Sequence, residues 1–504
     1  MKRLILVGAL GFLACTKTEA PARAFQINSR VELIGGVRAL ADTDAAPKDA
    51  TDLIGGKRAS GAEGDFKISN GLMHAIIQNV GTSRGFGSFG GSLIDIDLVR
   101  AGKSSSTSGV AGNDYFTEMF PAFFLTALEP SKVEVLNDGS DGKAAAIRVS
   151  GRSGAFISLV KAFTEVVDPT DPLDFTCDYI LEPGKQYLKI VVTVTNNGSR
   201  DAAWGLNVPF GFVTLLGEGQ RLFVPGQAGF DMRFHLEDVY KRPASLDAIP
   251  GEVTSMWATE GDGVSYAFVA GQNSAGSYLL NDRAVAGNYY PTATKDSILI
   301  PIASSSFLGT YFAKAPQNLP KPATMADGTK RVSSYSYTAF LAVGSGDVGS
   351  VQKVVYDLRD VTVRDNGKEF VVRDTIPYGT VSGFVREAKT NQPLEDVSVV
   401  LKDDKGNYVT QATTQKGGVW TAPVPAGKYT GYALDRIRSV ATVTEPVEVA
   451  EGGAASLNFT LQQPADLRVV VTDETGNPMP AKISVEGVYE NEDSNKHPRQ
   501  FFYD

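Results

Sequence analysis

Residues 179–198, YILEPGKQYLKIVVTVTNNG, carry the pattern that decides the fold of this chain. Apolar and polar side chains alternate along residues 187–195, which is the period of a strand that buries one face. Pro183-Gly184 before this run and an Asn-Asn-Gly triplet after it are turn signals. The stretch therefore predicts two antiparallel strands joined by a tight turn.

The same pattern recurs along most of the sequence. In GDFKISNGLMHAIIQN, residues 64–79, two alternating runs are joined by Asn70-Gly71, a strong hairpin signal. Helical spacing is best at 348–358, where Val351, Val355 and Leu358 fall on one face. Further strands are expected at 145–149, 155–163, 265–270, 297–301 and 336–343. The fold class is therefore all-β, with a large two-layer β-sandwich over residues 31–375 and a long surface loop at 313–331.

Length and composition limit the classes of function. A chain of 504 residues predicts two to four domains, and 42% apolar residues suffice for their cores. The 52 glycines favour turns and strands over helices. The net charge of −9 provides no basic surface for a polyanion, so we expect no nucleic-acid partner.

The first 15 residues, MKRLILVGALGFLAC, are expected to be a targeting segment. Lys2 and Arg3 precede an apolar run that is too short to span a bilayer as a helix. The run ends in FLAC, which resembles a bacterial lipobox; that resemblance implies lipidation of Cys15. Thr16 after the cysteine resembles sorting to the outer membrane of a Gram-negative bacterium. A plain secretory signal cut near residues 20–22 stays open as the alternative.

The residues that follow complete this interpretation of the N-terminus. Residues 16–30 are polar and unpatterned, and we expect them to be a tether. If Cys15 carries the lipid, Cys177 is left alone, so no internal disulfide is expected. Cys177 lies in the alternating run DFTCDYIL and is predicted to be a small buried hydrophobe.

From residue 379 the pattern changes to that of a small module. Its segments VSGFV, NQPLEDVSVVL, TTQKGGVWTAPVPAGKYTGYA and SLNFTL resemble a carboxypeptidase-regulatory-like domain, a seven-stranded sandwich similar to transthyretin, over residues 379–462. We expect Gly417 and Gly418 to form the turn before Trp420, which would fill the core. LRVVVTDETGNPMPAKISVEG then starts the same motif again, so residues 466–504 are expected to be an incomplete second module.

The large module has a more diffuse resemblance. GDFKISNGLMHAIIQ, GGSLIDIDL and the stretch at 179–198 resemble the β-supersandwich of galactose-mutarotase-like domains. Enzymes of that group use His and Glu as acid and base. Only His74, His235 and His497 are present, and none lies in a recognisable motif.

The best candidate ligand or ion site is acidic. Asp95, Asp97, Asp114 and Glu118 would supply the oxygen ligands that Ca²⁺ prefers, and Arg84 in a glycine-rich loop would hold an anionic ligand. The competing hypothesis is that these acids are solvated or protect a sheet edge. Gly85 to Gly90 spell GxGxxG, but the strand-like residues that follow argue against a nucleotide site. The tryptophans at positions 204, 257 and 420 are interpreted as core residues rather than sugar platforms.

These patterns predict a membrane-tethered extracytoplasmic β-sandwich protein. We expect it to bind a ligand, carbohydrate or peptide, or to act as a spacer, and to be non-catalytic by itself. One alternative is the accessory N-terminal part of a PHP-type metal-dependent hydrolase whose catalytic domain lies beyond residue 504; the order of modules resembles that family. The other alternative is a mutarotase-like sugar epimerase or lyase.

Overall fold

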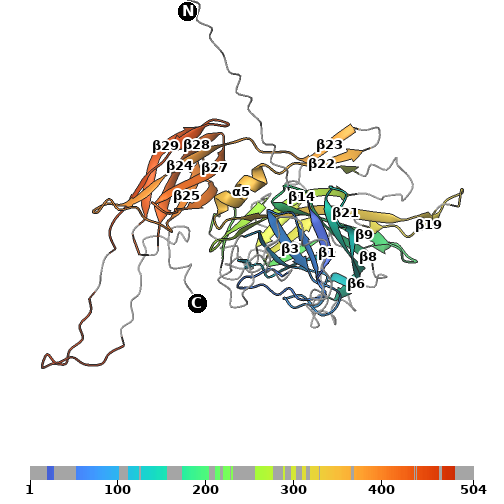
Figure 1. Ribbon diagram of the computed structural model, residues 1–504, viewed down its shortest axis with the longest axis horizontal. Coiled ribbons are helices and arrows are strands. Elements are labelled where there is room, and N and C mark those ends of the chain that lie inside the picture. The colour runs from blue at the N-terminus through green and yellow to red at the C-terminus, as the bar shows by residue number, and fades with distance from the viewer. Residues whose placement is uncertain are drawn as a thin grey trace, which may run out of the picture.

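The computed structural model describes residues 20–27, 53–100, 112–123, 126–155, 173–203, 210–215, 220–226, 229–230, 256–275, 288–289, 297–301, 309–313, 318–328, 330–364, 368–435, 437–438, 440–464 and 468–482. Within these ranges the chain is almost entirely β, with one helix, α5 (Val348–Tyr356). Figure 1 shows a large and a small β-module with α5 between them. The predicted all-β class is confirmed.

Seventeen strands of the large module join into one hydrogen-bonded antiparallel sheet. Chain neighbours pair from β1 to β9, and β21 returns to pair with both β9 and β14. The strands are β1 (Arg23–Gln26), β2 (Phe66–Ser69), β3 (Met73–Ile77), β4 (Leu93–Leu98), β5 (Glu118–Phe123), β6 (Thr126–Asn137), β7 (Ala145–Ala155), β8 (Asp174–Leu181), β9 (Tyr187–Asn196), β11 (Phe210–Leu215), β12 (Arg221–Phe223), β13 (Met256–Glu260), β14 (Ser265–Ala275), β15 (Asn288–Tyr289), β16 (Ser297–Pro301), β17 (Gly309–Ala313) and β21 (Ser333–Gly344). The strands expected at 145–149, 265–270, 297–301 and 336–343 are therefore confirmed.

The sheet folds back on itself, so that distant strands share one core. Tyr179 on β8 donates its hydroxyl hydrogen bond to the Gly91 carbonyl at 3.3 Å, and Tyr266 on β14 donates to the Ile96 carbonyl at 3.1 Å. Both tyrosines are fully buried. Cys177 lies in the same core as predicted, and burial raises the pKa of its thiol.

The two hairpins expected from sequence are present and contact each other. Gly184 turns the β8–β9 hairpin with φ 69°, and Gly71 turns the β2–β3 hairpin with φ 79°. Asn70 is buried, and its side-chain amide donates to the carbonyls of Glu182 and Lys185 at 2.7 and 2.6 Å. Asn70 therefore supplies more than a turn conformation: it ties one hairpin turn to the other.

The predicted tether at 16–30 needs a correction. Residues Arg23–Gln26 form β1, which pairs with β2 so that Ala24 lies opposite Ile68. Ala22, Ala24 and Ile27 are buried. Such small side chains give almost no hydrophobic periodicity, so the sequence pattern did not reveal this strand. Residues 23–26 of the predicted tether therefore belong to the sheet, and residues 16–19 and 28–30 lie outside the described ranges.

The segment predicted as a surface loop, 313–331, also contains short strands. Here β18 (Asn318–Leu319) pairs with β10 (Ala202–Ala203), and β19 (Ala323–Thr324) pairs with β20 (Lys330–Arg331). Leu319 is buried in the core of the large module. A further hairpin, β22 (Asp360–Arg364) with β23 (Lys368–Arg373), follows α5.

The small module is a sandwich of two four-stranded sheets. One contains β27 (Val419–Pro425), β24 (Tyr378–Glu387), β30 (Ala454–Ser456) and β31 (Phe459–Leu461); the other contains β26 (Tyr408–Thr413), β25 (Ser398–Asp403), β28 (Gly427–Leu434) and β29 (Ala441–Val449). Both β30 and β31 pair with β24, so they form one interrupted closing strand of the predicted seven. Gly417 and Gly418 make the expected turn with positive φ, and Trp420 is buried near Phe459.

Helix α5 joins the two modules. Asp347 caps it by accepting from the Ser350 amide at 2.8 Å, and Val351 and Val355 are buried as the spacing predicts. These valines share one hydrophobic cluster with Phe340 of the large sheet and Tyr432 of the small module. The modules therefore meet through a buried apolar joint.

Polar contacts complete this joint. Gln411 of β26 donates to a Glu260 carboxyl oxygen of β13 at 2.8 Å and accepts from the Val348 amide of α5 at 3.1 Å. Glu260 in turn pairs with Arg221 at 3.1 Å. Burial lowers the pKa of Arg221 to about 10. Burial also raises the pKa of Glu260, and the positive charge of Arg221 counteracts this rise.

Residues 468–482 contain one isolated β-bridge, between Thr472 and Pro478. The Met479 amide donates to the Val471 carbonyl at 3.2 Å, as the Leu394 amide does to Val385 at 3.0 Å. Met479 is 49% exposed, whereas its counterpart Leu394 is partly buried against the core of the small module. The incomplete second module expected at residues 466–504 stays a prediction, and residues 465–467 and 483–504 lie outside the described ranges.

Candidate functional site

The glycine-rich loop at residues 81–91 is held from below by one buried carboxylate. Glu118, at the start of β5, accepts from the hydroxyls of Ser83 and Ser92 at 2.6 and 2.7 Å and from the Gly87 amide at 2.7 Å. Glu118 itself is fully buried. A Cβ at Gly85 would lie 2.5 Å from a carboxyl oxygen of Glu118, so only glycine allows this approach.

A second carboxylate holds the flanks of the same loop. Asp65 accepts from the Asn79 amide at 3.0 Å and pairs with the guanidinium of Arg84. Arg84 also donates to the Ser60 carbonyl at 2.9 Å, and its own amide donates to Gln78 at 3.2 Å. Arg84 is therefore an internal partner of Asp65, although its side chain stays 37% exposed.

Asp95 orders the neighbouring segment, residues 54–62. Its two carboxyl oxygens accept from the amides of Ser60 and Gly61, each at 2.8 Å. Asp95 is fully buried on β4, and burial raises the pKa of its carboxyl to about 6 against the lowering effect of the two amides. The carboxyl therefore acts as a hydrogen-bonding bracket for a loop.

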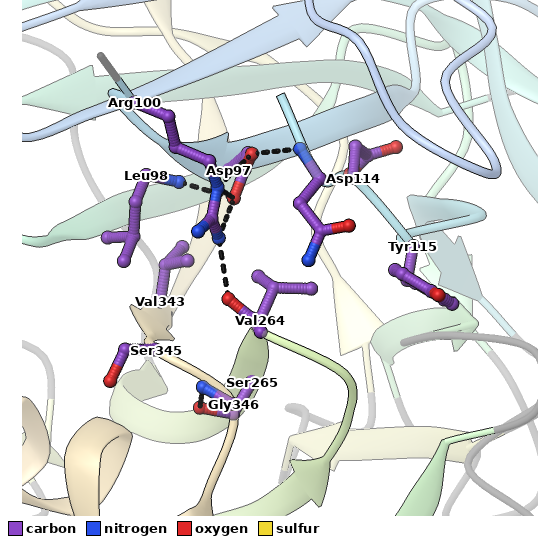
Figure 2. Close-up of polar contacts among 12 residues, drawn as sticks. Asp97, Leu98, Arg100, Asp114, Tyr115, Val264, Ser265, Val343, Ser345 and Gly346 are labelled. Carbon is purple, nitrogen blue, oxygen red and sulfur yellow. Dashed lines mark hydrogen bonds and ion pairs between the residues drawn. The ribbon is translucent and has the colours of Figure 1, made fainter. Parts of the chain in front are cut away.

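Asp97, two residues further along β4, forms a clasp with Arg100. Figure 2 shows the guanidinium against the carboxylate, with Nε–Oδ2 and Nη2–Oδ1 distances of 2.9 and 2.8 Å. The same Nη2 donates to the Gly263 carbonyl at 2.7 Å, and Asp97 also accepts from the Asn113 amide. This clasp ties the end of β4 to the β13–β14 turn and to the 112–115 segment.

Asp114 and His74 are two buried titratable groups near these loops that each have a polar atom without a hydrogen-bond partner. Asp114 Oδ1 accepts from the Ile96 amide and the Tyr266 hydroxyl, while Oδ2 has no hydrogen-bond partner. Burial, together with the charges of Asp95 and Asp97, raises the pKa of Asp114 well above its ordinary value. His74 Nε2 also lacks a partner, and burial lowers the pKa of the imidazole.

The structure brings the predicted site residues together at loops of the large module. Asp95, Asp97 and Asp114 lie close enough for their charges to interact, and Glu118 and Arg84 lie at the glycine-rich loop. No group of three or more His, Cys, Asp or Glu within the described ranges is arranged to hold a metal ion. The expectation of Ca²⁺ at these acids stays a prediction. In the described structure Asp95 and Glu118 accept hydrogen bonds from loop amides.

Two residues of this region were missed by sequence reasoning. Asp65 and Arg100 are as important to the loops as the predicted acids, because each completes an ion pair. The spacing of Asp97 and Arg100, three residues apart, was the available signal for one pair. No comparable signal marks Asp65 and Arg84, which lie 19 residues apart.

Other sequence hypotheses have clear outcomes. The glycine-rich motif is followed by β4, so the strand predicted after it is confirmed, and the interpretation that the motif is not a nucleotide site stays a prediction. Trp257 and Trp420 are core residues as interpreted. Cys15, Trp204, His235 and His497 lie outside the described residues.

We expect Asp95 to make stability fall as pH rises. Its pKa is about 6 in the fold and about 3.9 in an unfolded chain, so the folded state binds its proton more tightly. The resulting contribution, on the order of 2–3 kcal/mol, is complete below about pH 4 and lost through about pH 6. Urea unfolding between pH 4 and 7 measures this contribution. The free energy of unfolding of wild type minus that of Asp95→Asn should shrink as the pH rises.

The matched control for this prediction is Asp138→Asn. Asp138 is an exposed acid whose pKa is lowered by hydrogen bonds from Ser140. Its wild-type minus variant difference should not shrink over the same range. A difference for Asp95→Asn that stays flat or grows with pH would show that the buried carboxyl is ionised throughout.

Comparison with protein families identifies the small module. The family model for the carboxypeptidase regulatory-like domain matches residues 380–462. No curated protein matches the sequence. Among the described residues, no helix combines the length and apolarity needed to cross a membrane.

Several solved structures are similar to parts of the chain. Shaft pilin SpaA from Lactobacillus rhamnosus GG is 15% identical, with 41% of this chain and 86% of the pilin covered and a TM-score of 0.18. A proposed aldose 1-epimerase from Klebsiella pneumoniae is 11% identical, covering 59% and 84%, with a TM-score of 0.25. An alpha-mannosidase from Enterococcus faecalis is 10% identical, covering 84% and 43%, with a TM-score of 0.29. Scores this low carry no argument about function.

Proposed function

We propose that this chain is an envelope protein that binds a glycan or peptide ligand through the loops at one end of its large sandwich, without catalysing a reaction itself. These loops, at residues 54–65, 79–92, 112–118 and 261–264, are here called the loop end. A rigid scaffold that carries ordered loops is the common arrangement of binding proteins.

One observation carries this proposal: five buried acids are committed to ordering the loop end. They are Asp65, Asp95, Asp97, Asp114 and Glu118, and each is at most 1% exposed. Burial of a carboxyl group is costly unless hydrogen bonds compensate it. A spacer needs only a stable core. Loops held in one conformation lose less entropy when a ligand binds, and this supports a binding role.

The same commitment argues against acid–base chemistry at the loop end. His74, the one histidine among the described residues, is 8% exposed and has a lowered pKa. The carboxyl groups accept backbone amides, hydroxyls or arginine side chains. The hydrolase-associated and mutarotase-like alternatives stay predictions that no contact in the described residues favours.

The binding role is tested by probing arrays of oligosaccharides and peptides with the purified full chain. We expect at least one class to bind and the signal to drop when Glu118 is replaced by alanine. A folded chain that binds nothing on either array would contradict the proposal and leave the spacer role.

The membrane tether is tested at Cys15. In a Gram-negative host we expect wild-type protein in the outer-membrane fraction and Cys15→Ser in the soluble periplasmic fraction, because serine lacks the thiol to which the lipid would be attached. Cys177→Ser serves as the control and should stay with the membrane. Equal fractionation of wild type and Cys15→Ser would contradict lipid anchoring.

A further inference from the structure

We propose that three hairpin turns of the large module, at residues 70–72, 138–142 and 182–185, face the phospholipid bilayer that holds the lipid of Cys15, with Leu72 and Leu136 as the apolar contacts. These turns are here called the turn end. The inference rests on the lipid anchor of the proposed function and adds the surface that the tethered chain presents to the membrane.

The N-terminal segment enters the sheet at the turn end. A Cβ at Gly71 would lie 2.6 Å from the Cβ of Ala20, and a Cβ at Gly139 would lie 2.1 Å from the carbonyl oxygen of Ala22. Asn70 joins the first of these turns to the third through its two side-chain hydrogen bonds. The first described residues of the chain are therefore packed against turns that also contact each other.

Strand β1 then runs from the turn end to the loop end. The Ile27 amide, just after β1, donates to the Asp65 carbonyl at 2.7 Å, and the Gly64 amide donates to the Ile27 carbonyl at 2.8 Å. Asp65 belongs to the loop end, where it holds the glycine-rich loop. The extended chain from Arg23 to Ile27 covers about 13 Å, so the loop end begins that much further from the point of entry.

The length of chain between the anchor and the sheet decides which end meets the bilayer. Ala20 follows Cys15 by five residues. Even a fully extended chain spans at most about 3.6 Å per residue, so the lipid attachment point lies within about 18 Å of Ala20. A bilayer that holds Cys15 is therefore within reach of the turn end before the loop end. This orientation leaves the loop end open to a ligand.

The side chains of the turn end suit a phospholipid surface. Leu72, in the β2–β3 turn, is 44% exposed, and Leu136, where the β6–β7 register shifts beside the second turn, is 46% exposed. Exposed apolar side chains near lysines are typical of surfaces that touch the membrane interface.

The charges of the turn end are balanced. The charged residues on these turns and directly beside them are three cations and three acids, namely Arg23, Lys143, Lys185, Asp138, Asp141 and Glu182. The whole chain, in contrast, has a net charge of −9. A balanced surface meets no net repulsion from headgroups and has no need of anionic lipid, so the partner that it fits is zwitterionic phospholipid.

The test measures quenching of a fluorophore by nitroxide-labelled lipid. The lipidated full chain is inserted into vesicles of phosphatidylcholine and phosphatidylethanolamine, with a small fluorophore at Ser140→Cys on the turn end or at Thr82→Cys on the loop end. Both positions are exposed, whereas Cys177 is buried and stays unlabelled. We expect strong quenching at residue 140 and little at residue 82.

The apolar contacts are tested with a double variant. Leu72→Ser with Leu136→Ser should reduce the quenching at residue 140, because serine offers no apolar group to the lipid. Val80→Ser is the matched control and should change nothing, since Val80 is 45% exposed but lies in the loop end. The far-UV circular dichroism spectra should match that of wild type, because all three side chains are exposed.

Flotation of each variant with the vesicles separates this inference from the anchor itself. Equal quenching at both positions, or stronger quenching at residue 82, in a chain that floats would overturn the orientation and leave the lipid anchor standing. Quenching at residue 140 that survives both serines would remove the leucines as contacts. A wild-type chain that does not float would end the anchor and the orientation together, while the binding role keeps its own test on the arrays.

Discussion

Replacing Tyr432 with alanine is expected to split the thermal unfolding of this chain into two transitions. Tyr432 belongs to the small module but is 2% exposed and packs in the cluster shared with α5 and the large sheet. Truncating a buried aromatic side chain costs about 3–5 kcal/mol. The lost stability weakens the contact between the two modules, so the small module should then unfold in a separate transition. Scanning calorimetry measures the number of transitions, which we expect to be one for wild type.

Tyr429→Ala is the matched control for this experiment. Tyr429 lies on the same strand, β28, and is 4% exposed, but it packs in the small module's own core. We expect this variant to lower the melting temperature and keep a single transition. Two transitions in wild type, or one transition in Tyr432→Ala, would show that the joint does not couple the modules.

Replacing Glu118 with alanine is expected to release the glycine-rich loop. The change leaves two hydroxyls and the Gly87 amide without their acceptor, and unmade buried hydrogen bonds of this kind cost about 2–4 kcal/mol in sum. We expect faster amide hydrogen exchange over residues 83–88 and loss of ligand binding. Exchange in the small module should not change.

Glu118→Gln separates the negative charge from the hydrogen bonds. Glutamine has nearly the same volume; its carbonyl oxygen can accept from the Gly87 amide, and its amide nitrogen can donate to the oxygens of the Ser83 and Ser92 hydroxyls. We therefore expect it to release the loop less than alanine does. Unchanged exchange at residues 83–88 in both variants would mean that Glu118 does not order the loop.

Strands β8 and β9 and helix α5 could be predicted from the sequence because each has one face that is more exposed than the other. Strands β8 and β9 alternate between buried and partly exposed residues along their length, and α5 has valines at helical spacing. Strand β1 escaped detection because its buried residues are mainly alanines. Small side chains leave too weak a periodic signal.

The sequence contains a signal for the joint between the modules, at residues 398–401. Four successive residues of β25, from Ser398 to Leu401, are buried, as expected of a strand covered on both faces. In the sequence these residues read SVVL, a run without alternation. A strand buried on both faces in a small sandwich indicates that something covers its outer sheet, and here that cover is α5.

The task of the acids could not be predicted from sequence. Asp95 and Glu118 bind backbone amides of Ser60, Gly61 and Gly87, and a backbone amide leaves no signature in the choice of residue. An aspartate or glutamate that binds a metal ion and one that accepts hydrogen bonds from a loop therefore look the same in the sequence. Only the structure distinguishes them, because it shows which atoms the oxygens face.

The most direct test of the binding role is amide hydrogen exchange of the full chain with and without the best ligand from the arrays. We predict that added protection falls on residues 79–91 and the adjoining segments of the loop end. Protection confined to the small module, or no protection anywhere at saturating ligand, would contradict a binding surface built on these buried acids.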